Sequence, residues 1–100
     1  MASPKLSDAE IKTALGGLPG WSVREGQLEK TYEHPTFPEA IIFVNAVAHL
    51  AELANHHPDV DIRYSKITLR LTTHDSGGIT AKDVALAKEV ETARSRMARG

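Results

Sequence analysis

Three of the five histidines in the chain lie in one stretch of the sequence, at positions 56, 57 and 74. His56 and His57 are adjacent and are followed by Pro58. An unperturbed imidazole titrates near pH 6.5, so it can donate or accept a proton at neutral pH. One imidazole can therefore serve as a general acid while another serves as a general base, and each such transfer contributes roughly 10² to 10⁴ in rate. This grouping predicts acid–base chemistry at His56, His57 and His74.

Two carboxylates accompany these histidines. Glu52 precedes His56 by four positions, which is one turn if the two share a helix, and Asp83 follows His74. Both carboxylates are candidates for binding and orienting groups, either toward an imidazole or toward a substrate. Asp83 has a competing role, because Thr80 and Asp83 have the spacing of a helix-capping pair. The sequence does not decide whether Asp83 is a binding and orienting group or a helix cap.

Two other kinds of site are weaker alternatives. A zinc ion could be bound by His56, His57 and His74, since imidazole suits zinc. Adjacent ligands converge poorly on one ion, however, and the spacing matches none of the common zinc motifs. The chain has no cysteine, and no serine lies in a recognisable nucleophile motif, so a hydrolase triad is set aside. We therefore predict a site without a metal.

The elements that must position these residues alternate between helix and strand. Capping signals predict helices starting at Ser7, Thr36 and Thr80, the first ending at Gly16 and Gly17. Period-two alternation predicts strands at 21–23, 28–32, 60–64 and 67–72, the last two joined at 65–66. Trp21 is interpreted as a core or rim aromatic in preference to a binding residue. The order α-β-β-α-β-β-α predicts an α+β fold: a four-stranded antiparallel sheet with three helices packed on one face, in a single domain spanning residues 1–100.

The positions of the histidines on these elements make two further predictions. Pro58 disfavours helical geometry at His57, so the central helix should end between His56 and His57. His74 follows the polar parity of strand 67–72, which would point it away from the helix-covered face. A pocket shared by all three histidines therefore requires the strand to end or bulge near Thr73.

The central helix is apolar over most of its surface. Its polar residues form a narrow stripe, made of Asn45, His49, Glu52 and His56. Asn45 and His49 are interpreted as a solvated edge. One sheet face cannot cover so much apolar surface, so we expect a partner subunit to pack on this helix.

Composition excludes several classes of function. A net charge of −1, with 41% hydrophobic and 25% charged residues, is typical of a globular domain. Direct nucleic-acid binding is not expected, because there is no basic patch. The first residues contain no apolar run typical of a signal peptide, and the apolar stretch 40–54 is interrupted and short for a membrane span. We expect a cytoplasmic protein without a membrane partner.

Several of these residues carry a resemblance to a known family. The pattern Glu52-x-x-x-His56-His57-Pro58, followed by Tyr64, His74 and Asp83, resembles the signature of pterin-4a-carbinolamine dehydratases. Trp21 and the helix start Phe37-x-x-Ala40-x-x-Phe43 also look like that family. The resemblance covers essentially the whole chain.

The resemblance implies dehydration of 4a-hydroxytetrahydrobiopterin to quinonoid dihydropterin and water, which recycles the cofactor of aromatic amino acid hydroxylases. The pterin is then the substrate, and neither a cofactor nor a metal is implied. His56 and His74 would form the acid–base pair, and His57 would position the pterin. Glu52 and Asp83 would hold imidazoles or the amino edge of the pterin.

The family also implies a homodimer or homotetramer, in which sheets join edge to edge and helices pack together. Members of the family act as dimerisation partners of a homeodomain transcription factor through the same helix surface. An interaction role therefore stands as the alternative to the enzyme.

Overall fold

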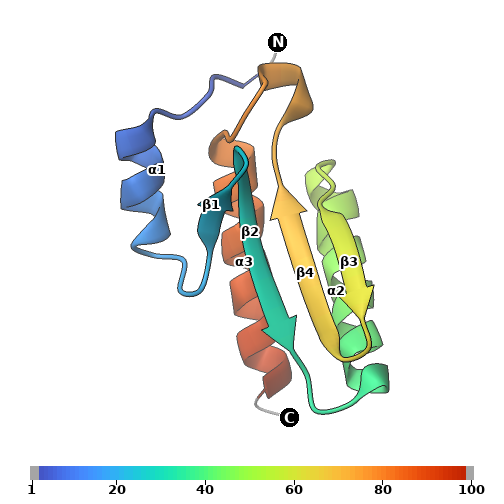
Figure 1. Ribbon diagram of the computed structural model, residues 1–100. Helices are drawn as coiled ribbons and strands as arrows, with labels where there is room; N and C mark the ends of the chain where they lie inside the picture. The colour runs from blue at the N-terminus through green and yellow to red at the C-terminus, as the bar shows by residue number, and fades with distance from the viewer. Residues whose placement is uncertain (1–2, 99–100) are drawn as a thin grey trace.

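The computed structural model describes residues 3–98 and has the element order that the sequence predicts (Figure 1). One element was not predicted, a 3-10 helix between the last strand and the last helix. The elements are α1 (Asp8–Leu15), β1 (Ser22–Arg24), β2 (Gln27–Glu33), α2 (Phe37–Ala54), β3 (Asp59–Arg63), β4 (Lys66–Leu71), the 3-10 helix η1 (His74–Ser76) and α3 (Ala81–Ala98).

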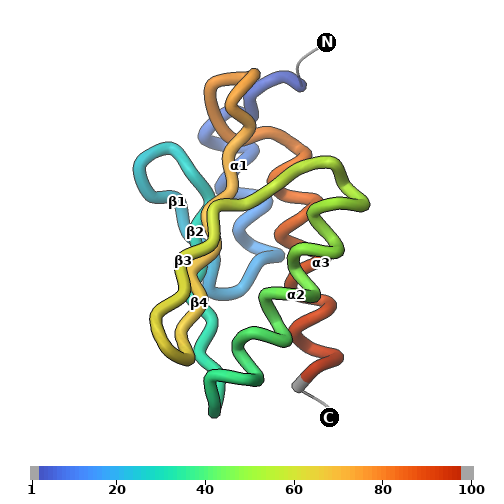
Figure 2. The backbone as a smooth tube through the Cα atoms, turned by 90° about the vertical axis from the view of Figure 1, so that its right-hand side faces the viewer, coloured from blue at the N-terminus to red at the C-terminus, as the bar shows by residue number. Residues whose placement is uncertain are grey.

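The four strands form one antiparallel sheet in the order β1-β2-β4-β3. The helices lie on one side of this sheet, as Figure 2 shows when the sheet is seen nearly edge-on. Strand β4 is central and pairs with β2 and β3, and its alternating residues Ile67, Leu69 and Leu71 are buried. The predicted fold class is confirmed.

The core lies between the sheet and the two long helices. Helix α2 buries residues at helical spacing, namely Ala40, Phe43, Val47 and Ala51. Helix α3 packs on α2 and buries Leu86, Ala87 and Val90. Trp21 is 5% exposed, so of the two predicted places, core or rim, it occupies the core. The capping box predicted for the first helix is present, with both Ser7–Glu10 hydrogen bonds formed.

The opposite side of α2 remains exposed although it is apolar. Ile42 is 58% exposed and Leu53 is 72% exposed. The polar residues Asn45 and His49 are also exposed, as predicted. Over its 18 residues α2 has a mean hydropathy of 1.4, so by length and composition alone it could cross a membrane. The other side of α2 packs into the core of a sheet-containing domain. A soluble core helix can have the same length and hydropathy, so these two properties are weak evidence for a membrane span.

The turn between β3 and β4 differs from the prediction by one residue. Arg63 pairs with Lys66, so the two-residue connection is Tyr64–Ser65, and Tyr64 belongs to the turn instead of the strand. Tyr64 adopts a left-handed backbone with φ of 52°. An aromatic residue gives no sequence signal for that conformation, which is usually marked by Gly or Asn.

Candidate active site

The end of α2 places both neighbouring histidines outside the helix. Asn55 takes the left-handed conformation, with φ of 49° and ψ of 43°, and its N–H bonds back to the carbonyls of Ala51 and Glu52. The N–H of His56 also donates to the Ala51 carbonyl, at 3.1 Å. The prediction that the helix ends between His56 and His57 is therefore wrong. Asn tolerates the left-handed region, so the helix stops at Ala54 before the effect of Pro58 is reached.

His56 is bound to Asp83 across the gap between α2 and α3. Its Nε2 lies 2.5 Å from Oδ1 of Asp83. The Asp83 side chain is fully buried, and the side chain of His56 is 12% exposed. A carboxylate in such a place must have its acceptor positions filled, because an unsatisfied buried charge is costly.

The second oxygen of Asp83 is also satisfied. Its Oδ2 accepts a hydrogen bond from the backbone N–H of Thr80 at 2.9 Å and from the hydroxyl of Thr73 at 2.8 Å. The hydroxyls of Thr73 and Thr80 lie 2.8 Å apart. Asp83 therefore caps α3 with one oxygen and binds His56 with the other, so its two roles coexist. Thr73 was not predicted as a site residue, although its place next to His74 could have suggested it.

His57 and Glu52 form a second histidine–carboxylate pair. The Nε2 of His57 lies 2.6 Å from Oε1 of Glu52, and the two side chains are 57% and 78% exposed. The predicted relation of Glu52 to His56, one helical turn apart, is wrong. The left-handed backbone of Asn55 redirects the chain, so that His57, and not His56, contacts Glu52.

Each pair fixes which ring nitrogen is available for chemistry. An ionised carboxylate only accepts hydrogen bonds, so Nε2 of His56 and Nε2 of His57 carry the protons that point at Asp83 and Glu52. In the neutral imidazoles Nδ1 is then the unprotonated atom. Such an arrangement can accept a proton at Nδ1 and return it, while the carboxylate stabilises the imidazolium formed.

His74 lies at the point where the last strand stops. Strand β4 ends at Leu71, Thr73 forms an isolated bridge with Gly78, and His74 opens η1. The break expected near Thr73 therefore exists. Thr73 is buried and faces Asp83, whereas His74 is exposed. Figure 1 shows η1 at the same end of the sheet as the loop between α2 and β3.

The structure brings the five predicted residues together as two pairs and one separate side chain. In residues 3–98, His74 makes no side-chain hydrogen bond with His56 or His57. No group of three or more His, Asp or Glu side chains in that range is arranged to hold a metal ion. Beside the first pair, a hollow of about 160 Å³ is lined by Ala54, His56, Lys82, Ala85, Leu86 and Glu89.

Known proteins are similar to this chain in sequence and in fold. The family model described as Pterin 4 alpha carbinolamine dehydratase matches residues 4–93. A protein of Roseiflexus sp. (strain RS-1), named as a candidate pterin-4-alpha-carbinolamine dehydratase, is 55% identical over 87% of this chain and 94% of its own. A protein of Koribacter versatilis with the same name is 52% identical over 85% of this chain and 90% of its own.

Two solved structures share the fold. A transcriptional coactivator/pterin dehydratase from Brucella melitensis is similar with a TM-score of 0.84, at 28% identity over 88% of this chain and 96% of that one. A pterin dehydratase-like protein described as a RuBisCO assembly factor has a TM-score of 0.59 at 19% identity, covers 72% of this chain and 83% of its own, and is similar in fold alone. The family match and the close relatives together show that the chain belongs to the pterin 4 alpha carbinolamine dehydratase family.

Proposed function

We propose that this protein dehydrates a 4a-hydroxytetrahydropterin to the quinonoid dihydropterin and water. Membership of the family supports the reaction class. The observation that carries the proposal is the buried pair of His56 and Asp83, because it supplies an oriented imidazole beside solvent-accessible histidines. Once a separate reductase has reduced the product to the tetrahydropterin, it would again serve as the cofactor of aromatic amino acid hydroxylases, in the cytoplasm.

The reaction needs one acid and one base. The bond between ring carbon 4a and its hydroxyl oxygen breaks, and the oxygen takes a proton to leave as water. The neighbouring ring nitrogen gives up its proton, and its electron pair forms the new carbon–nitrogen double bond. The charges balance without a metal or a redox partner, so histidines of suitable protonation state are sufficient.

In this proposal His56 and His74 carry out these two proton transfers, one as the acid and the other as the base. Asp83 holds His56 through Nε2, which leaves Nδ1 of His56 for the substrate. His57, held by Glu52, positions the pterin at the open side of the site. The exposure of His57 and His74 supports these assignments, because groups that touch a substrate must be reachable from solvent.

Turnover of freshly generated 4a-hydroxytetrahydropterin tests the proposal. We expect His56→Ala and His74→Ala each to reduce kcat by roughly 10² to 10⁴. His49→Ala is the matched control, since His49 is an exposed histidine on α2 that belongs to neither histidine–carboxylate pair. Chelator treatment should leave turnover unchanged. Folded His56→Ala and His74→Ala proteins with wild-type kcat would contradict the assignment.

The exposed apolar side of α2 favours a second role, binding of another protein chain. Ile42 and Leu53 project from it, and the edge strand β3 exposes Val60 and Ile62. Self-association as a homodimer or homotetramer would cover these residues; a transcription factor is the alternative partner. Light scattering that gives a monodisperse monomer at micromolar concentration would exclude self-association. A stoichiometric foreign partner in a pull-down would favour the interaction role.

A further inference from the structure

A second pocket lies at the opposite end of the helices from the His56–Asp83 pair. It has a volume of about 500 Å³ and is lined by His34, Pro35, Glu39, Ile42, Arg94 and Met97. Glu39 and Ile42 belong to the first turns of α2, and Arg94 and Met97 belong to the last turns of α3. His56 and Asp83, in contrast, lie at the end of α2 and the start of α3. The proposed reaction uses no residue of this pocket.

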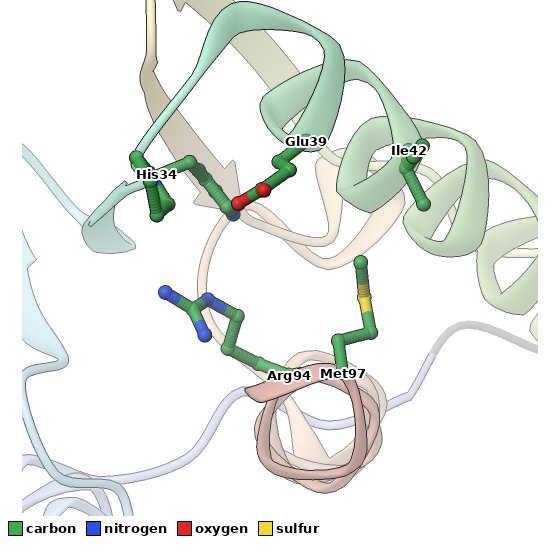
Figure 3. Close-up of a pocket in the computed structure, with 6 residues that line it drawn as sticks. His34, Glu39, Ile42, Arg94 and Met97 are labelled. Carbon is green, nitrogen blue, oxygen red and sulfur yellow. The ribbon is translucent and has the colours of Figure 1, made fainter. Parts of the chain in front are cut away.

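Two opposite charges face each other across this pocket. Figure 3 shows the Arg94 guanidinium on the α3 side and the Glu39 carboxylate on the α2 side. Arg94 is anchored by one hydrogen bond, from Nη2 to the Glu33 carbonyl at 3.0 Å. Within residues 3–98, neither Arg94 nor Glu39 has an ion-pair partner within 4.0 Å. Both charges are therefore available to a ligand.

His34 contributes a wall of the pocket without adding a charge. Its Nδ1 lies 3.3 Å from the Ser65 carbonyl and so must carry the proton, which makes Nε2 an acceptor. Burial is the main cause that holds the pKa of His34 below its usual value of 6.5; the hydrogen bond to Ser65 and the charge of Glu39 oppose this lowering, and the charge of Arg94 adds to it. The imidazole is therefore neutral at neutral pH, and its ring packs against Phe43 with centroids 5.0 Å apart.

The remaining lining is apolar. Pro35, Ile42 and Met97 form this part of the surface, and Figure 3 shows the Met97 side chain reaching toward the α2 side of the pocket. Small-molecule sites typically have volumes of about 300 to 1,000 Å³ with mostly apolar walls and a few polar anchors. This pocket has that size and that mixture of residues.

We infer that the pocket binds a free α-amino acid with a large apolar side chain. The ligand carboxylate would bind the guanidinium of Arg94, and its ammonium group would bind the carboxylate of Glu39. The side chain would lie against Ile42 and Met97. A zwitterion fits because it offers an opposite charge to each of the two facing groups, whereas an anion or a cation alone pairs with only one of them.

An NMR titration with L-phenylalanine tests the inference, using the protein in its solution assembly because Ile42 also belongs to the face proposed for self-association. We expect saturable amide shifts at Glu39, Ile42, Arg94 and Met97. N-acetyl-L-phenylalanine lacks the ammonium group and phenethylamine lacks the carboxylate. Each should bind about tenfold more weakly or worse, since each loses one charge-assisted hydrogen-bonded contact.

Substitutions separate this site from the proposed active site. Arg94→Gln and Glu39→Gln should each weaken L-phenylalanine binding by about tenfold or more. Both should leave pterin turnover unchanged, and Arg96→Gln is the control on the same helix outside the pocket. No saturable shift at the four residues would overturn the inference, as would equal affinity for either half-charged analogue or unchanged binding in both variants. These results do not depend on whether the protein is a dehydratase.

Discussion

The two histidine–carboxylate pairs have nearly the same length but very different surroundings. The Nε2–Oδ1 distance of His56 and Asp83 is 2.5 Å, and the Nε2–Oε1 distance of His57 and Glu52 is 2.6 Å. Asp83 is fully buried, whereas the Glu52 side chain is 78% exposed. Burial, and not distance, decides what each contact contributes to stability, because water screens and competes for the exposed pair.

The difference also gives the two pairs different uses. Asp83 is held by Thr73 and Thr80 and cannot turn away from His56 without leaving those groups unsatisfied. Glu52 has no such second anchor among the described residues, so His57 keeps its freedom to follow a substrate. The buried pair suits proton transfer, and the exposed pair suits positioning.

Removal of the buried carboxylate should have the largest effect. Asp83→Ala leaves His56, Thr73 and the Thr80 N–H without their acceptor, so we expect a loss of about 3 kcal/mol or more in the free energy of unfolding. Turnover should fall by at least roughly 10². Urea denaturation and the dehydration assay measure the two losses. Asp75→Ala, an exposed acid in η1, is the control. A stability loss no larger than that of Glu52→Ala would break the comparison.

A smaller change tests whether the threonine network holds Asp83. Thr73→Val removes the hydroxyl that donates to Oδ2, and we expect it to cost about 1 to 3 kcal/mol in the free energy of unfolding. Thr73→Val should also lower kcat, because Asp83 then holds His56 less firmly, whereas Thr73→Ser keeps the hydroxyl and should keep most of the kcat. Urea denaturation and the dehydration assay measure both effects, and a kcat of Thr73→Val no lower than that of Thr73→Ser would show that the hydrogen bond does not hold Asp83 for the reaction.

Glu91 offers an intermediate case, because its side chain is 22% exposed. Its Oε2 accepts hydrogen bonds from Trp21 Nε1 at 3.2 Å, from Lys30 Nζ at 2.7 Å and from the Tyr32 hydroxyl. Burial alone would raise the pKa of Glu91, but the hydrogen bonds from Lys30 and Tyr32 hold it below its usual value of 4.5. Burial and the Glu91 carboxylate raise the pKa of the Tyr32 hydroxyl, which therefore remains a donor.

This carboxylate gives a pH-dependent prediction. A folded-state pKa below the unfolded value means that the stabilisation is present above about pH 4.5 and is lost as the pH falls through the folded-state pKa. Glu91→Gln should therefore cost about 1 to 2 kcal/mol at pH 7 and less at pH 3. Urea denaturation of both proteins at the two pH values measures this. A gap that widens at pH 3 would contradict the sign.

The exposed pair should show the smallest effect. Glu52→Gln should change the free energy of unfolding by less than about 0.5 kcal/mol, and added salt should reduce the difference further. Thermal unfolding at low and high ionic strength is sufficient to measure it. A loss comparable to that of Thr73→Val would mean that the solvated pair contributes as much as the buried network.

Local sequence signals were enough to predict the three α-helices and the four strands of this fold, though not η1. The Ser7–Glu10 capping box and the alternation of Ile67, Leu69 and Leu71 are both read from neighbouring residues, and both are present. Such patterns depend on the chain within one turn or one strand, and tertiary packing does not change them. The fold class followed from the order of the elements.

The pairing of the site residues could not be predicted in the same way. One left-handed residue, Asn55, moved His56 and His57 out of the helix and exchanged the partner of Glu52. The contact of His56 with Asp83 joins residues far apart in sequence and depends on how α2 packs on α3. The network around Asp83 needed Thr73, which continues the buried parity of β4 but whose hydroxyl reaches Asp83 only because the start of α3 packs beside the end of that strand.

The shared carboxylate of Asp83 gives the site a reporter that needs no substrate. The amide of Thr80 donates to Oδ2 of Asp83, so exchange of that amide with solvent deuterium requires the first turn of α3 to open. The same opening frees Oδ2 and so loosens the carboxylate whose other oxygen, Oδ1, orients His56. The exchange rate at a single backbone amide therefore measures how often the unliganded protein loosens the carboxylate that orients His56, the imidazole proposed to transfer a proton.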